Sequence, residues 1–281
     1  MTIETISEHA CFGGVQGFYR HASREIGLPM QFAVYQPPQA QHRPVPLLFF
    51  LAGLTCTEET FMIKAGAQRW AAEHGVMLVA PDTSPRKTGI ADAAKDWDFG
   101  EGAGFYLDAT QAPWATHFRM ESYIVRELYD ALPGRFNSTG RVGIFGHSMG
   151  GHGALTLALR NPDRFASVSA FAPIAAPAQC PWGRKAFGNF LGQKSDAWVA
   201  HDASALMRSR TTPFPQGILI DQGLADKFLQ EQLMPEEFEQ ACMQAGQPLT
   251  LRRHAGYDHG YYFIASFMEE HVKFHAAALN P

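Results

Sequence analysis

Residues 141–160 read RVGIFGHSMGGHGALTLALR, and this stretch decides the fold of the chain. It begins as a short apolar run of strand character, passes through a Gly-x-Ser-x-Gly motif at positions 146–150, and ends in small residues followed by helix formers. A strand, a sharp turn and a helix in this order form the context of a nucleophilic serine. Glycines on both sides of the turn relieve the crowding around a strained serine backbone. The stretch therefore predicts an α/β sheet with the Ser148 hydroxyl raised above it, at the N-terminus of a helix.

The motif by itself is a weak signal, because Gly-x-Ser-x-Gly arises by chance in glycine-rich chains. The alternative interpretation is a glycine-rich turn whose serine merely caps the following helix. The strand before the motif and the helix after it favour a nucleophile. Such a serine also needs a base, an acid and an oxyanion site from the rest of the chain.

Composition and charge limit the classes of protein to which the chain can belong. Its 281 residues are 46% apolar and 18% charged, so a large hydrophobic core can form. No linker divides the chain, and we expect residues 1–281 to form a single domain. The net charge of −4 is mild, and no run of Lys or Arg favours nucleic acid or an anionic membrane as a partner. No apolar run reaches membrane-spanning length.

The cysteines and the N-terminal segment indicate the compartment. Cys11, Cys56, Cys180 and Cys242 are widely spaced and fit neither a zinc pattern nor a dense disulfide framework. The N-terminal segment is acidic and lacks the apolar stretch of a signal peptide. We therefore expect a cytoplasmic protein with reduced thiols, without a metal or a cofactor.

Strand and helix patterns alternate after an antiparallel start. Residues 17–23 and 30–36 alternate as edge strands do. Further strands are predicted at 45–51, 76–80, 141–145, 166–171, 217–221 and 249–253. Helices are predicted at 65–74, 116–132, 151–160, 230–245 and 262–278. We expect a mostly parallel sheet with helices on both faces and a ligand site beyond the carboxyl ends of the strands.

Two long stretches, 81–115 and 172–215, are rich in Gly, Pro and Trp and are predicted to be irregular. Long loops inside a compact domain are usually functional. We expect them to contribute to the substrate site.

The base is sought among the histidines that follow Ser148, because the chain order in α/β-hydrolases is Ser, then Asp or Glu, then His. His259 lies in a glycine-bounded loop between the last predicted strand and the last predicted helix, where the catalytic histidine belongs. His254, at the end of that strand, is the alternative.

Three other histidines are interpreted differently. His152 is one turn along the helix that follows Ser148, so its ring cannot easily swing back. His271 and His275 are four residues apart, a spacing that can bind a metal, but no carboxylate pattern completes a site. We expect these two to lie on a solvent-exposed helix face.

The acid is predicted to be Asp226, which lies in the loop after the strand at 217–221 and can reach across to the next loop. Asp221 ends that strand and is predicted to cap the turn. Asp258 adjoins His259, and neighbouring side chains in a loop usually diverge.

Two backbone N–H groups are predicted to form the oxyanion hole. One belongs to Met149, the residue after the nucleophile, and the other comes from the loop after the strand at 45–51. In that loop Gly53 allows the turn, and Leu54 is placed to donate.

At this level of detail the chain resembles the S-formylglutathione hydrolase (esterase D) family. The resembling motifs follow the family order across nearly the whole chain and are far more specific than Gly-x-Ser-x-Gly. They are LAGLTCT (51–57), APDTSPR (80–86), WDFGEGAGFYLDAT (97–110), GHSMGGHGA (146–154), DQGLADKFL (221–229) and GYDHGYYF (256–263). One departure is Gly260, which stands where many members have serine.

The resemblance implies an α/β-hydrolase fold and hydrolysis of S-formylglutathione to formate and glutathione, a step of formaldehyde detoxification. It places the catalytic triad on Ser148, Asp226 and His259 and the oxyanion donors on Leu54 and Met149. It also implies an accessory thiol at Cys56 that confers sensitivity to thiol reagents, and homodimers, which are frequent in the family. The alternatives are a broader small-acyl carboxylesterase or acyltransferase with the same triad, and an inactive binding protein.

Glutathione is expected to bind against the two long loops. The candidates for the walls are Trp97, Phe99, Phe105, Tyr106 and Trp182, each of which could instead be part of the core. The candidates for carboxylate partners are Lys64, Arg86 and Lys87, each of which could instead be solvated surface charge.

Overall fold

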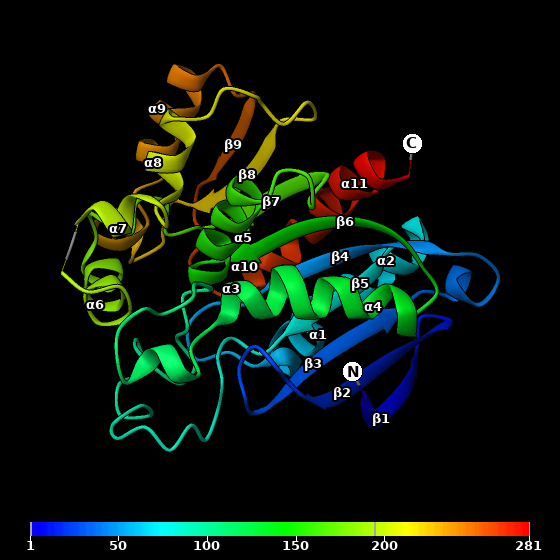
Figure 1. The fold of residues 1–281 in the computed structure, drawn as a ribbon. Helices are drawn as coiled ribbons and strands as arrows, with labels where there is room; N and C mark the ends of the chain where they lie inside the picture. Colours follow the sequence, from blue (N-terminus) through cyan, green and yellow to red (C-terminus); the bar gives the residue numbers. More distant parts are fainter. Residues whose placement is uncertain (1, 194, 281) are drawn as a thin grey trace.

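The structure is a computed structural model that describes residues 2–193 and 195–280. In these residues nine strands form one sheet, in the order β1-β2-β3-β5-β4-β6-β7-β8-β9 (Figure 1). The strands are β1 (Glu4–Cys11), β2 (Gly14–Ala22), β3 (Pro29–Gln36), β4 (Val45–Leu51), β5 (Met77–Pro81), β6 (Ser138–His147), β7 (Ser167–Phe171), β8 (Ile218–Gly223) and β9 (Leu249–His254).

The direction of the strands agrees with the predicted fold. β1, β2, β3 and β5 pair antiparallel in that order, and every pair from β5 through β4 to β9 is parallel. The expected α/β-hydrolase architecture is thus confirmed, with its antiparallel N-terminal strands. β1 was not predicted, because most of its side chains are exposed at the sheet edge and leave no alternation of buried and polar residues.

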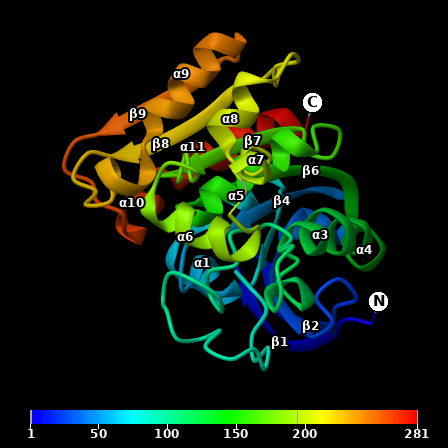
Figure 2. The ribbon, with the colours of Figure 1, turned by 60° about the vertical axis from the view of Figure 1, so that its left-hand side comes forward.

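Helices cover both faces of the sheet. In Figure 1, α4 and α5 lie in front of the sheet and α2 and α11 lie behind it, and Figure 2 shows the same layers from the side. The helices are α1 (Glu58–Lys64), α2 (Ala67–His74), α3 (Met120–Ser122), α4 (Tyr129–Arg135), α5 (Met149–Arg160), α6 (Pro181–Phe190), α7 (Ser195–Val199), α8 (Ala203–Arg208), α9 (Pro235–Ala245), α10 (Tyr261–Ser266) and α11 (Met268–Leu279). Within the described ranges no helix combines the length and the apolarity that a membrane span requires.

The prediction that residues 172–215 are irregular is wrong, since this stretch contains α6, α7 and α8. α6 buries Trp182, Ala186, Phe187 and Phe190 at helical spacing, and both α6 and the shorter α8 begin at a local cap. The Cys180 sulfur accepts a hydrogen bond from Gly183 N, and the Asp202 carboxylate accepts one from Ala205 N.

The predicted helix boundaries also need correction. The helix predicted at 116–132 is a succession of a 3₁₀ turn, α3, a π-helical segment and α4. The helix at 230–245 is interrupted before Pro235, where Met234 has a left-handed φ of 48°. The helix at 262–278 is divided at Phe267 into α10 and α11.

Packing at the centre of the sheet holds β4 and β6, the two strands that end at the predicted site, in place. Every residue of β4 is buried. Phe50 of β4 stacks on Phe61 of α1 with 3.7 Å between ring centroids, and both rings pack edge-on against Phe145 of β6. These rings hold the carboxyl ends of β4 and β6 side by side, where the sequence predicts the oxyanion loop and the nucleophile.

Candidate active site

Ser148 occupies the turn between β6 and α5 in a strained conformation, with φ 57° and ψ −119°. Its N–H donates to Phe171 O at 3.0 Å, and its carbonyl accepts from His152 N at 2.9 Å and from Ile174 N at 3.2 Å. A Cβ at position 146 or 150 would overlap backbone oxygens of the adjacent turn or of β4. The two glycines of the motif are therefore required by the close approach of the turn to β4.

The predicted base and acid are in contact. His259 Nδ1 donates to Asp226 Oδ2 at 2.5 Å, and the second carboxylate oxygen accepts from Phe228 N at 2.9 Å. The Asp226 side chain is fully buried, whereas 17% of the His259 side chain is exposed. Because Nδ1 carries the proton, Nε2 is the nitrogen with a free lone pair and can accept a proton from a nucleophile.

Ser148 and His259 line one pocket of about 140 Å³. The other residues that line it are Gly53, Leu54, Cys56, Trp97, His147, Trp182, Phe228 and Tyr261. In the described structure no hydrogen bond joins the Ser148 hydroxyl to His259, and contacts of this kind tighten when the substrate binds. The pocket brings together residues from six segments that the sequence separates widely: 53–56, 97, 147–148, 182, 228 and 259–261.

The loop after β4 lies directly against the nucleophile turn. A Cβ at Gly53 would be 3.3 Å from Ser148 Cβ. The loop is held by Tyr106, whose hydroxyl donates to Ala52 O at 2.8 Å. Within residues 2–193 and 195–280, the amides of Leu54 and Met149 have no backbone acceptor. Both predicted oxyanion donors are thus available beside Ser148.

His147 is a residue of the site that the sequence analysis missed. Its ring packs at a tilt of 47° against that of His259, with 4.4 Å between centroids, and lines the same pocket. Burial lowers the pKa of His147 well below its usual value, and the neighbouring His259 lowers it further. A neutral His147 leaves room for positive charge on His259 without repulsion. The sequence signal that could have identified His147 is its place in the Gly-x-Ser-x-Gly motif, directly before Ser148.

Cys56 lies in the pocket, as expected for an accessory thiol. Burial raises the pKa of this thiol, so it is protonated near neutral pH. The thiolate is the reactive form of cysteine, and Cys56 is therefore no competitor of Ser148 as nucleophile.

The aromatic candidates divide into two groups. Trp97 and Trp182 line the pocket and pack edge-on against each other, 5.6 Å apart. Phe99 does not line it, because its ring packs against Trp114 and Phe190 in the core. Phe105 and Tyr106 are also core residues. The prediction that these last three form a substrate wall is wrong, and Tyr106 instead anchors the oxyanion loop.

Arg86 is bound within the protein. Its guanidinium contacts Asp82 Oδ1 at 2.7 Å and donates to Cys56 O at 2.8 Å. These bonds brace the loop that carries Leu54 and Cys56, so the expectation that Arg86 holds a substrate carboxylate is wrong. Lys87 does not line the pocket, and its backbone N–H donates to Glu101 at 3.0 Å.

The alternative base, His254, lies outside the Ser148 pocket. Its ring stacks on Phe267 with 3.8 Å between centroids, and its Nε2 is 3.2 Å from Asp221 Oδ1. The prediction that Asp221 caps the turn after β8 is wrong. Asp221 lies within the strand, and its carboxylate pairs with Arg252 of β9 at 2.5 Å. This correction leaves Asp226 as the carboxylate that contacts the histidine of the pocket.

The prediction that His271 and His275 are exposed to solvent is wrong, because both are fully buried. His271 Nε2 lies 3.3 Å from Asp221 Oδ2, and its Nδ1 lies 2.8 Å from Ser169 Oγ. His275 lies between Ser169 and Ser167, at 2.8 Å and 2.7 Å. Serines of β7 thus bind the two rings from the sheet, and both nitrogens of each ring have a partner.

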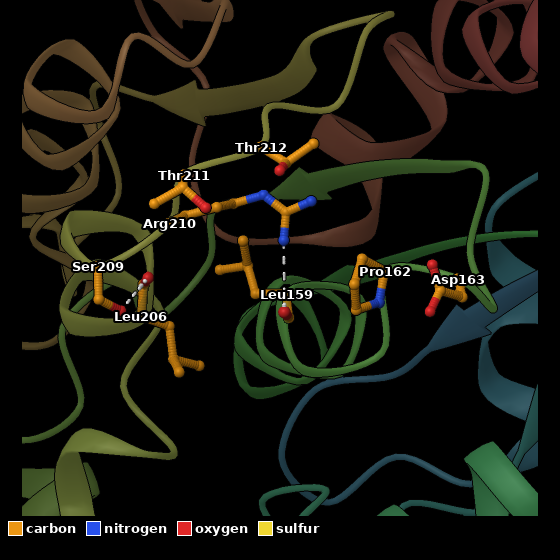
Figure 3. Close-up of a pocket in the computed structure, with 8 residues that line it drawn as sticks. All are labelled: Leu159, Pro162, Asp163, Leu206, Ser209, Arg210, Thr211 and Thr212. Atoms are coloured by element: carbon orange, nitrogen blue, oxygen red, sulfur yellow. Dashed lines mark hydrogen bonds between the residues drawn. The ribbon is translucent and has the colours of Figure 1, made fainter.

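A larger hollow of about 410 Å³ lies at the other end of α5 (Figure 3). In it Arg210 donates to Leu159 O at 3.4 Å, and Ser209 donates to Leu206 O at 2.9 Å. Its lining residues offer neither a histidine nor a cysteine. We therefore place the chemistry in the smaller pocket, which contains Ser148.

The chain is similar to known proteins over nearly its whole length. The Esterase family model matches residues 23–274. An S-formylglutathione hydrolase of Paracoccus denitrificans (strain Pd 1222) is 51% identical over 281 residues, which are 100% of this chain and 99% of that protein. One of Rattus norvegicus is 49% identical over 282 residues and covers 100% of both chains. The solved structure of an S-formylglutathione hydrolase from Agrobacterium tumefaciens has a TM-score of 0.95 at 48% identity, over 98% of this chain and 99% of that one.

Proposed function

The chain belongs to the S-formylglutathione hydrolase family, and we propose that it hydrolyses S-formylglutathione to formate and glutathione as a serine hydrolase. In this proposal Ser148 is the nucleophile, His259 the general base and Asp226 the carboxylate that orients His259. The observation that carries it is the 2.5 Å contact between Asp226 and His259, which lines the same pocket as Ser148.

The first half-reaction transfers the formyl group to the enzyme. Ser148 Oγ attacks the formyl carbon while His259 Nε2 accepts the hydroxyl proton. The C–S bond then breaks, the electron pair leaves with sulfur, and the proton on His259 returns to the departing thiolate to give glutathione. Asp226 stabilises the imidazolium that exists between these steps.

The second half-reaction regenerates Ser148. Water attacks the formyl ester while His259 accepts a proton from it, and the C–O bond to Ser148 breaks as that proton returns to Oγ. Formate leaves. In both half-reactions the carbonyl oxygen becomes an anion, and we assign its stabilisation to the N–H groups of Leu54 and Met149. Loss of one such donor typically removes about 3–4 kcal/mol of transition-state stabilisation.

The dimensions of the pocket favour a small acyl group. A volume of about 140 Å³ is less than the roughly 300 Å³ at which sites for drug-sized ligands begin. Trp182 and Phe228 form part of its wall. A formyl group fits beside Ser148 in this space, whereas each added carbon of a larger acyl group would have to occupy space next to the Trp182 and Phe228 rings.

A side-by-side kinetic comparison tests this function. We expect kcat/KM for S-formylglutathione to exceed that for S-acetyl- and S-lactoylglutathione and for nitrophenyl esters. Similar values for the thioester and simple nitrophenyl esters would contradict the assignment. Preferential transfer of the acyl group to an alcohol or sugar would indicate the alternative, a small-acyl carboxylesterase or acyltransferase.

Three further properties are proposed with the function. We propose a cytoplasmic location, because the four cysteines are free and the substrate is a conjugate of a reduced thiol. We propose that residues 1–281 form one domain, because the strands belong to one sheet. We propose a homodimer on the basis of the family, and sedimentation equilibrium of the purified protein tests it.

A further inference from the structure

We propose that Lys64 and Lys227 bind the two ends of glutathione on opposite sides of the Ser148 pocket. In this arrangement Lys64 and Asp258 hold the γ-glutamyl end, and Lys227 holds the glycyl carboxylate. The inference rests on the proposed function, because it assigns the recognition of that substrate. It goes beyond that function by naming the groups that distinguish glutathione from any other thiol.

Four aromatic rings of the pocket contact one another in series, a row that connects the two lysines. His147 and His259 pack against each other at a tilt in the middle of this series. Tyr261 flanks His147 at 6.2 Å, and Phe228 flanks His259 at 5.1 Å, both between ring centroids. All four rings line the pocket. A substrate whose sulfur lies beside Ser148 therefore has one end near Tyr261 and the other near Phe228.

Each end of this row has a lysine. Lys64 Nζ lies over the Tyr261 ring, 5.9 Å from its centroid, and Lys227 Nζ lies over the Phe228 ring, 4.9 Å from its centroid. Both lysines are exposed, and neither forms an ion pair with a carboxylate in the described part of the chain. The two ammonium groups are free to bind the two carboxylates that an extended glutathione presents.

Two other cations near the pocket, Arg86 and Lys185, are already paired. Arg86 is bound to Asp82, and Lys185 lies between Asp96 at 2.8 Å and Asp98 at 2.5 Å. Binding a substrate carboxylate through either would break an internal ion pair. This distinguishes Lys64 and Lys227 from their neighbours.

A second hollow beside the Ser148 pocket fits the γ-glutamyl end. It has a volume of about 500 Å³, shares Tyr261 with the catalytic pocket, and is lined by both Lys64 and Asp258. The γ-glutamyl end has a carboxylate and an ammonium on the same carbon, so it needs one cation and one anion close together. Asp258 is oriented by Gly260 N, which donates to its Oδ1 at 2.8 Å.

The glycyl end needs a single cation, and Lys227 provides one. Lys227 follows Asp226 directly and lies beside Phe228, whose ring packs on Trp182 at 4.7 Å. The proposal thus places the neutral middle of the tripeptide over the aromatic row and its charged ends at the two lysines.

Matched substrates and variants test the assignment. S-Formyl-N-acetylcysteinylglycine lacks the γ-glutamyl end, and its acetyl group prevents transfer of the formyl group to nitrogen. The S-formyl derivative of glutathione glycinamide lacks only the glycyl charge. Each is compared with S-formylglutathione in the wild type, Lys64→Met, Lys227→Met and, as the control, Lys273→Met, whose lysine pairs with Glu269 on α11.

We expect Lys64→Met and Lys227→Met each to lower kcat/KM for S-formylglutathione by about 10- to 100-fold, mainly through KM. Lys64→Met should have no further effect on the substrate without the γ-glutamyl end, and Lys227→Met none on the glycinamide. Asp258→Asn should follow the pattern of Lys64→Met. Lys273→Met should leave kcat/KM for all three substrates unchanged, and the losses in the Lys64 and Lys227 variants should be much smaller on nitrophenyl acetate, which has no carboxylate, than on S-formylglutathione.

If Lys64→Met and Lys227→Met lowered kcat/KM equally for all three substrates, or for none of them, the proposal would be overturned. A reversed pattern, with Lys64 linked to the glycyl charge, would overturn the assignment of the ends. These results are distinct from failure of the proposed function, which would appear as a wild type that does not prefer S-formylglutathione to nitrophenyl esters.

Discussion

Asp221 lies in β8 and Asp226 in the loop that follows it, and each carboxylate meets a histidine ring. Both aspartate side chains are fully buried. His259, the partner of Asp226, is part of a pocket wall and has a second nitrogen without a protein partner. His271, the partner of Asp221, is fully buried, and Ser169 occupies its second nitrogen.

The difference lies in what surrounds each pair and not in the residues that form it. Burial lowers the pKa of His271 more than Asp221 can raise it, so this ring is neutral and serves as a hydrogen-bonded link between β8, β7 and α11. His259 has room to accept a proton from Ser148 and return it. An aspartate–histidine pair is thus a structural link when both ring nitrogens are occupied and a base when one is open.

The largest expected effect is on turnover, through the Asp226–His259 pair, which we call the open pair because the second ring nitrogen of His259 has no protein partner among the described residues. Ser148→Ala and His259→Ala should each lower kcat by about 10⁴- to 10⁶-fold, and the double variant should lose little more, because the two residues act as a unit. Steady-state kinetics on S-formylglutathione measure this, with thermal melts to verify folding. Activity within tenfold of wild type in either variant would break the triad assignment.

Asp226→Asn should lower kcat by about 10⁴-fold, because an amide no longer fixes the tautomer of His259. The melting temperature should change little, since the amide is nearly isosteric. The matched variant is Asp221→Asn, which should retain turnover within a few-fold of wild type while it is folded. Loss of activity in both variants would contradict the separation of the two pairs.

Asp221→Asn should instead lower the free energy of unfolding. Burial alone would raise the pKa of Asp221, but hydrogen bonds from His271 and Arg252 outweigh it and lower this pKa to about 2. The shift from the usual value of 3.8 corresponds to about 2 kcal/mol. Urea unfolding near neutral pH should show this loss, and equal midpoints in variant and wild type would contradict it.

The same carboxylate predicts how stability changes in acid. Because the folded pKa of Asp221 is depressed, its contribution is present above the usual pKa of 3.8 and is lost as the pH falls through about 2. The difference in unfolding free energy between wild type and Asp221→Asn should therefore shrink toward zero over this interval. A difference that stays constant down to about pH 2 would show that Asp221 does not titrate as described.

The smallest effect is expected at Cys56. Cys56→Ser should keep kcat within a few-fold of wild type, because the thiol is protonated and does not attack the substrate. Since burial raises the pKa of Cys56, iodoacetamide should inactivate the wild type slowly near neutral pH and faster in alkali. Inactivation kinetics as a function of pH measure this. Cys56→Ser should be resistant, and loss of all activity in this variant would show that the thiol has another role.

The open pair could be predicted from the sequence because its constraints are local. Gly146 and Gly150 are required wherever a serine turn approaches β4, and the loops after β8 and β9 bring Asp226 and His259 to the same edge of the sheet. Asp226 was distinguished from Asp221 by its place in the loop beyond the strand, although the turn cap predicted for Asp221 was wrong.

The Asp221–His271 pair could not be predicted, because the residues that bind its histidine come from other strands and helices. His271 and His275 are polar residues on a helix, and the sequence does not reveal that this helix faces Ser167 and Ser169 of β7. Their burial depends on a tertiary contact and not on helical periodicity.

In the irregular loop at 81–115, too, the sequence does not reveal which side chains make tertiary contacts. Trp97 and Phe99 are two residues apart, yet Trp97 lines the pocket and Phe99 packs in the core. An irregular loop has no period, so the sequence does not show which side chain faces the site.

The rate at which a fluorophosphonate labels Ser148 tests the central claim most directly, because it reports activation of this hydroxyl without any assumption about the substrate. We predict stoichiometric labelling of wild type that is lost in Ser148→Ala, strongly slowed in His259→Ala and Asp226→Asn, and preserved in folded Asp221→Asn. Labelling of Ser148 at the wild-type rate in Asp226→Asn, or its loss in folded Asp221→Asn, would contradict the account.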